Sequence, residues 1–116
     1  MVMDRQQGRI IQDRLEVGDF RSKAVNTETL AGTKTLVITD NMMQFLDPGG
    51  SARNVDLPAE ADSDGKMFVI CNRADGAEVI TIRNDAGGTI CTPTQNESAM
   101  VFCDGTTWAG LVGASS

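Results

Sequence analysis

The sequence predicts an all-β protein, a small antiparallel β-sandwich or barrel that carries an extended N-terminal arm. After Lys34, short apolar segments alternate with turn residues, and the turns recur every eleven to seventeen residues. No window after Lys34 keeps the apolar period of a helix. Residues 1–34 hold six basic against five acidic residues, whereas residues 35–116 hold four against eleven. These differences divide the chain into an arm, 1–34, and an acidic β-domain, 35–116.

Strands of the β-domain are predicted where β-branched and apolar residues concentrate or alternate with polar ones. In order, these segments are 35–39, 43–46, 53–57, 66–73, 78–84, 88–94, 97–103 and 106–112. Alternation places Val55 with Leu57, and Ile80 with Ile82, on one face of their strands. Between strands stand turn signals such as DPGG at 47–50, since proline presets one turn dihedral and glycine accepts a positive φ.

Composition excludes several classes of function. The net charge of −6 and a pI near 4.4 argue against nucleic acid, which needs clustered Lys and Arg. The longest apolar runs are five residues, 67–71 and 99–103, so no segment predicts a membrane-spanning helix, and the N-terminus lacks a secretory signal. Histidine, the commonest general base and metal ligand, is absent. The three cysteines form no CxxC pair and are interpreted as reduced packing residues.

The acidic residues suggest two possible sites, a cation site and a pair of catalytic carboxylates. Asp62-Ser63-Asp64-Gly65 resembles the start of a calcium loop, but the third acidic position and the closing glutamate are missing, so a solvated turn is predicted. Most other aspartates stand beside glycine or proline, where aspartate caps turns. A small hydrolase with paired carboxylates therefore ranks last, and we assign no catalytic, cofactor-binding or metal-binding residue.

The small β-domain, with few aromatic residues, predicts association of several copies, because small all-β bodies bury little surface and expose strand edges. Trp108 is expected to be a packing residue near a subunit contact. The arm, whose apolar residues lack a period, is expected to be disordered until it binds a partner. Its candidate contact residues are basic and apolar: Arg5, Arg9, Ile10, Ile11, Arg14, Leu15, Val17 and Phe20.

A succession of motifs runs from Leu36 to Trp108: LVITDNMMQFLDPGG, RNVDLPAEADSDGKMFVICN, VITIRNDAGGTI and SAMVFCDGTTWAG. This succession resembles the β-domain of capsid decoration (cement) proteins of tailed bacteriophages. Related patterns occur in trimeric tail-fibre and tailspike modules. The resemblance covers about two-thirds of the chain and rests on turn pattern more than on reactive residues.

The resemblance implies a non-enzymatic homotrimer on the capsid exterior of the virion, assembled in the host cytoplasm. Its partner would be the major capsid protein, held by the arm, and it would stabilise the head against internal pressure. The alternative is a trimeric tail-fibre or tail-tip module for host attachment. Neither nucleic acid nor membrane is expected as a partner, and no cofactor.

Overall fold

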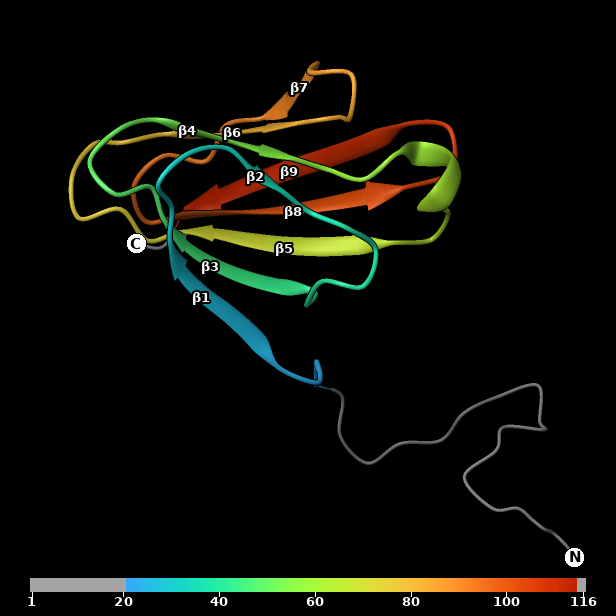
Figure 1. Ribbon diagram of the computed structural model, residues 1–116, viewed down its shortest axis with the longest axis horizontal. Helices are drawn as coiled ribbons and strands as arrows, with labels where there is room; N and C mark the ends of the chain where they lie inside the picture. The colour runs from blue at the N-terminus through green and yellow to red at the C-terminus, as the bar shows by residue number, and fades with distance from the viewer. Residues whose placement is uncertain (1–20, 115–116) are drawn as a thin grey trace, which may run out of the picture.

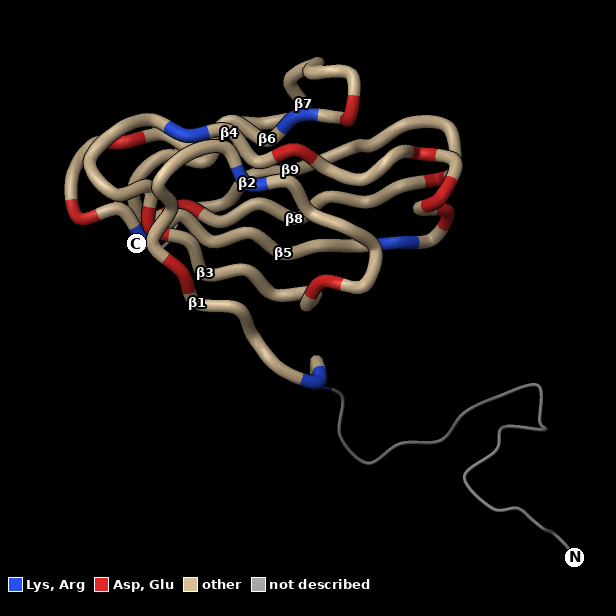
Figure 2. Tube along the Cα trace, viewed as in Figure 1, with Lys and Arg blue, Asp and Glu red and all other residues tan. Residues whose placement is uncertain are grey.

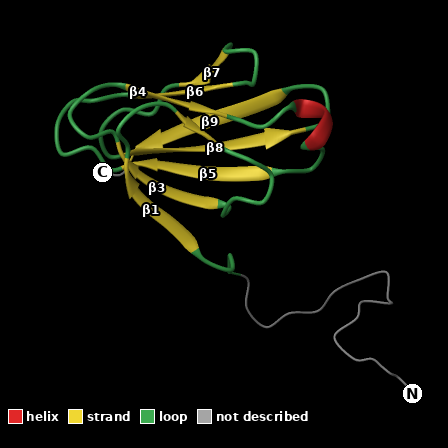
Figure 3. Ribbon diagram, in the orientation of Figure 1, coloured by secondary structure: helices red, strands yellow, loops and turns green. Residues whose placement is uncertain are grey.

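Two facing β-sheets make up the part of the protein that the computed structural model describes, residues 21–114 (Figure 1). The five-stranded sheet has the order β1 (Val25–Thr29), β3 (Met43–Asp47), β5 (Met67–Asn72), β8 (Glu97–Cys103) and β9 (Trp108–Ala114). The four-stranded sheet has the order β2 (Lys34–Thr35), β4 (Arg53–Asp56), β6 (Ile80–Arg83) and β7 (Thr89–Cys91). One 3₁₀ turn, η1 (Glu60–Asp62), is the helical element among the described residues (Figure 3).

The chain alternates between the sheets from β1 to β6. As a result, β1, β3 and β5 run parallel in one sheet, and β2, β4 and β6 run parallel in the other. The pairs β5–β8, β8–β9 and β6–β7 are antiparallel. The predicted all-β class is confirmed, but both sheets are mixed rather than antiparallel. Turn residues predict that the chain reverses direction. They do not indicate whether the next strand pairs in the same sheet or joins the opposite one.

The strand assignments differ from the prediction mainly at the start of the body. In segment 35–39 only Thr35 lies in a strand, and a turn follows in which the Val37 amide donates to Asp40 Oδ2 at 2.8 Å. Conversely, residues 25–29, assigned to the arm, form β1 and pair in parallel with β3. Their sequence, VNTET, is polar because β1 is an edge strand with alternately exposed side chains. The seven later predicted strands overlap β3 to β9.

The core lies between the sheets and is built from alternate residues of the strands. Val55, Leu57, Ile80 and Ile82 are buried, as the alternation predicted. The other large apolar side chains of the core are Leu30, Leu36, Leu46, Phe68, Ile70, Val101 and Trp108. Each strand therefore turns one face inward and leaves the other on an outer surface.

Trp108 closes the core at the end where β9 begins. Its side chain is 6% exposed, and its ring centroid lies 6.2 Å from that of Phe68. Its indole Nε1 donates a hydrogen bond of 2.9 Å to the Pro58 carbonyl oxygen, which follows β4. Trp108 is therefore a packing residue of its own chain, as predicted, and its role near a subunit contact stays a prediction.

A buried asparagine fixes the loops at the opposite end of the sheets. Asn72 Nδ2 donates to the carbonyl oxygens of Glu78 and Pro93, each at 3.0 Å. Its Oδ1 accepts the Ala74 amide at 2.9 Å. One side chain at the end of β5 thus holds the loops before β6 and after β7.

Candidate interaction surface

The two sheets present chemically different outer faces. On the four-stranded sheet, the residues between the buried ones are polar: Asn54 and Asp56 on β4, Thr81 and Arg83 on β6. Arg83 forms a two-pronged ion pair with Asp56, with Nε–Oδ1 at 2.6 Å and Nη2–Oδ2 at 2.8 Å. The hydrogen bond to Asp56 raises the pKa of Arg83. This face is an ordinary solvated surface.

The outer face of the five-stranded sheet carries an apolar row that crosses all five strands. The strand registers align Val25, Met43, Val69, Met100 and Leu111 as lateral neighbours. The neighbours of Met43, Val69 and Met100 along their strands, which are Gln44, Ile70 and Ala99, are buried. Because side chains alternate along a strand, the residues of the row point outward. Val25 and Leu111, at the two ends of the row, are 51% and 53% exposed.

The residues above and below the row are also uncharged. Met67, Phe102 and Ala109 flank it on one side, and Thr27, Phe45, Cys71, Ser98 and Gly113 flank it on the other. These eight residues and the row are together called the uncharged face. Figure 2 shows that charges lie mainly in loops and at strand ends, while the middles of β3, β5, β8 and β9 carry none. Contiguous apolar surface of this extent is typical of interaction sites.

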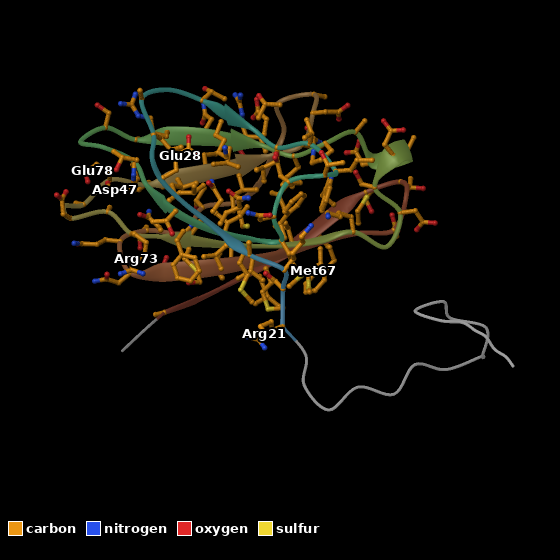
Figure 4. All side chains as sticks on the ribbon, turned by 60° about the horizontal axis from the view of Figure 1, so that its bottom comes forward. Arg21, Glu28, Asp47, Met67, Arg73 and Glu78 are labelled. Carbon is orange, nitrogen blue, oxygen red and sulfur yellow. The ribbon has the colours of Figure 1, made fainter. Side chains whose placement is uncertain are left out.

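A polar rim borders the uncharged face where β1, β3 and β5 end. The Arg73 guanidinium carbon lies 5.7 Å from the centre of the Phe45 ring, in a cation–π arrangement. Shallow pockets of about 360 and 260 Å³ lie on either side of this pair. The first is lined by Thr27, Glu28, Thr29, Phe45, Asp47 and Arg73. Figure 4 shows Arg73 and Asp47 toward one end of the molecule and Met67 nearer its middle.

The rim carboxylates already have partners within the chain. Glu28 accepts Asn26 Nδ2 and Lys34 Nζ, both at 2.9 Å, and the hydrogen bond from Asn26, followed by the one from Lys34, lowers the pKa of Glu28. Asp47 Oδ1 accepts the Gly49 amide at 2.9 Å, so it caps the turn after β3 as predicted for aspartates beside glycine or proline. These contacts give Glu28 and Asp47 a structural role within the chain.

The other residues singled out from the sequence are those of the arm, the possible calcium loop and the cysteines. Arg5, Arg9, Ile10, Ile11, Arg14, Leu15, Val17 and Phe20 lie outside the described residues. Asp62, the last residue of η1, and Asp64 are exposed. Residues 21–114 contain no group of three or more acidic or cysteine side chains placed to hold a metal ion. Cys103 is buried, and burial raises the pKa of the Cys91 thiol.

Sequence reasoning missed the uncharged face, although the signal was present. The unbroken apolar runs 67–71 and 99–103 lie in segments that the sequence predicts to be strands. A strand with one solvated face should alternate apolar and polar residues, so an unbroken run indicates that both faces are apolar. These runs are β5 and most of β8, which lie side by side in the sheet.

Comparisons with family models, with curated proteins and with solved structures found no match to this chain. Within residues 21–114, no helix has the length and apolar character needed to cross a membrane.

Proposed function

We propose that this protein is a structural component of a virus particle, a non-enzymatic capsid decoration protein that binds the outer capsid surface as a homotrimer. In this proposal residues 1–20 contact the major capsid protein, and the β-domain joins the copies to one another. The assembled protein stabilises the head. The proposal extends the resemblance in the motifs between Leu36 and Trp108.

The observation that carries the proposal is the contrast between the two outer faces. One face bears the Asp56–Arg83 ion pair and is suited to water, whereas the other is uncharged across five strands. A protein whose role is to bind other proteins needs such a face. Multivalency would strengthen binding to the capsid, because once one arm of a trimer is bound the other two bind as intramolecular contacts.

A trimeric tail-fibre or tail-tip module is the second candidate function, and one observation favours it. From β1 to β6 the chain alternates between two sheets, so that equivalent strands stack in parallel. This winding resembles the stacked coils of β-helices and solenoids, in which parallel strands repeat along an axis. A short coil of this kind would suit a segment of a fibre shaft.

Co-sedimentation with particles tests the proposal. Full-length protein and a variant that lacks residues 1–20 are mixed with undecorated heads and, separately, with purified tails. We expect the full-length protein to sediment with heads and the shortened one to stay in solution as a folded trimer. Buried apolar side chains contribute about 1.5–3 kcal/mol each, and exposed ion pairs under about 1 kcal/mol, so added salt should weaken binding only moderately.

The other outcomes decide between the candidates. Sedimentation with tails alone would replace the decoration proposal with the tail-module proposal. Undiminished binding of the shortened protein to heads would move the capsid contact to the β-domain and refute the role of residues 1–20. Binding to neither particle would refute both virion roles.

A further inference from the structure

We propose that three copies of this chain pack their uncharged faces around a common three-fold axis, with β9 of one copy beside β1 of the next. This inference rests on the trimer of the proposed function and names the surface that forms it. It assigns the apolar row of Val25, Met43, Val69, Met100 and Leu111 to a core shared by the three copies.

The charge distribution favours another copy of this chain as the occupant. The chain carries −6, so two copies repel each other wherever acidic residues approach. The uncharged face is a broad region where copies can meet without such contacts, because its bordering charges lie at strand ends (Figure 2). The row itself carries no strong hydrogen-bonding side chain, and the hydroxyls of the uncharged face are those of Thr27 and Ser98 at its margin, whereas a saccharide needs several such groups for recognition.

The dimensions of the sheet fit a three-sided arrangement. Five strands at a spacing of about 4.8 Å give a face about 24 Å wide. Three such faces arranged as a triangle place each sheet about 7 Å from the axis, whereas two packed sheets about 10 Å apart leave about 5 Å for each side-chain layer. The larger space suits long, flexible methionines, which the face supplies at Met43, Met67 and Met100.

The exposure pattern agrees with this arrangement. In a triangle of faces, neighbouring sheets converge at the corners, where the edge strands β1 and β9 lie. Val25 and Leu111 stand at these edges, and each is about half exposed in the single chain. Strand β9 is an edge without charge or proline, which is the kind of edge that proteins normally cover.

Disulfide trapping tests the packing in the full-length chain. In the double variant Val25→Cys, Leu111→Cys, oxidised glutathione should link β9 of one copy to β1 of the next and close a covalent trimer on a non-reducing gel. A bond within one chain is excluded, because the two positions are four strand spacings, about 19 Å, apart and a disulfide needs Cα atoms within about 7 Å. The matched control is Ile38→Cys, Leu111→Cys, since Ile38 is 46% exposed but lies in a turn outside the uncharged face.

The remaining controls are the wild-type protein, which has its own Cys71 on this face, and the two single variants. A covalent trimer formed only by the Val25, Leu111 double variant supports the inference. Covalent dimers alone would replace the three-fold packing with a two-fold one and overturn it. Equal cross-linking in the Ile38 control would overturn it as well.

Light scattering separates this inference from the proposed function. The Leu111→Lys variant should fall from about three chain masses to one while its β-sheet circular dichroism stays unchanged, and Ile38→Lys should remain a trimer. A wild-type trimer that tolerates Leu111→Lys and gives no cross-link would overturn the shared face while the proposed trimer stands. A wild-type monomer would overturn both. A cross-linked trimer that binds no heads would refute the decoration function and leave the shared face intact.

Discussion

Replacing Trp108 with phenylalanine should destabilise each chain by about 2 kcal/mol without changing how the copies associate. The variant loses the hydrogen bond from Nε1 to the Pro58 carbonyl, which costs about 1 kcal/mol. The smaller ring leaves a cavity of roughly 40 Å³ beside Phe68, which costs about 1 kcal/mol at about 24 cal/mol per Å³. For a chain of 116 residues, 2 kcal/mol corresponds to a fall in Tm of roughly 6–12 °C.

Urea titration followed by circular dichroism measures this loss, at one fixed chain concentration because association contributes to apparent stability. Ile38→Val is the matched control, since Ile38 is a large apolar residue that is 46% exposed in a turn outside the uncharged face. It should keep the wild-type stability to within about 0.5 kcal/mol. Unchanged stability of Trp108→Phe together with a change in oligomeric mass would refute the energetic role of Trp108 in the core and support a direct subunit contact.

Three further predictions concern the glycines of the turn after β3, the buried side chain of Asn72 and the stability of the fold at low pH. Gly49→Ala should destabilise the fold more than Gly50→Ala. Both glycines have a positive φ, 79° and 93°, which disfavours any other residue. A Cβ at Gly49 would also lie 2.6 Å from a backbone carbonyl oxygen, whereas a Cβ at Gly50 would meet nothing within 4 Å. In thermal unfolding we expect a cost of about 1–2 kcal/mol for Gly50 and a further 1–3 kcal/mol for Gly49; equal costs would refute the close contact. Asn72→Ala should cost about 3 kcal/mol or more in urea titrations, because it strands buried backbone groups, whereas Asn54→Ala on the solvated face should cost under about 0.5 kcal/mol. Stability should be constant between about pH 5 and 7 and fall as the pH drops through about 4 and below, because a carboxylate whose folded pKa is lowered loses its stabilising contribution when it is protonated. The carboxylates with a lowered pKa are Glu28, Glu97 and Asp104. An acid titration of the unfolding free energy that stays flat down to pH 3 would contradict this assignment.

Strand positions could be predicted from the sequence because they depend on local chemistry. Alternation identified Ile80 and Ile82 as core residues, and glycine and aspartate located the turns. Strand β1 was missed because an edge strand needs few apolar residues, and VNTET looks like an arm when its partner β3 is unknown.

Sheet direction and the uncharged face could not be predicted in the same way. Both depend on pairings between residues far apart in the chain, such as Val25 with Met43 and Met43 with Val69. A local pattern does not carry this information, because the same turn signal serves a hairpin and a crossing to the opposite sheet. The unbroken apolar runs 67–71 and 99–103 do carry a local signal of this face, because such a run indicates a strand with two apolar faces rather than one.

The alternation of strands between the two sheets also sets the order in which the protein can fold during synthesis. Every strand from β1 to β5 is followed in the chain by a strand of the other sheet, so none of these forms a hairpin with its successor. The adjacent pairs able to form early are β6–β7 and β8–β9, which leave the ribosome last. Local pairings form faster than distant ones, because closing a long loop costs entropy before any contact is gained. Contact order therefore favours the hairpins β6–β7 and β8–β9 as early pairings, although β1, β3 and β5 precede them in the chain.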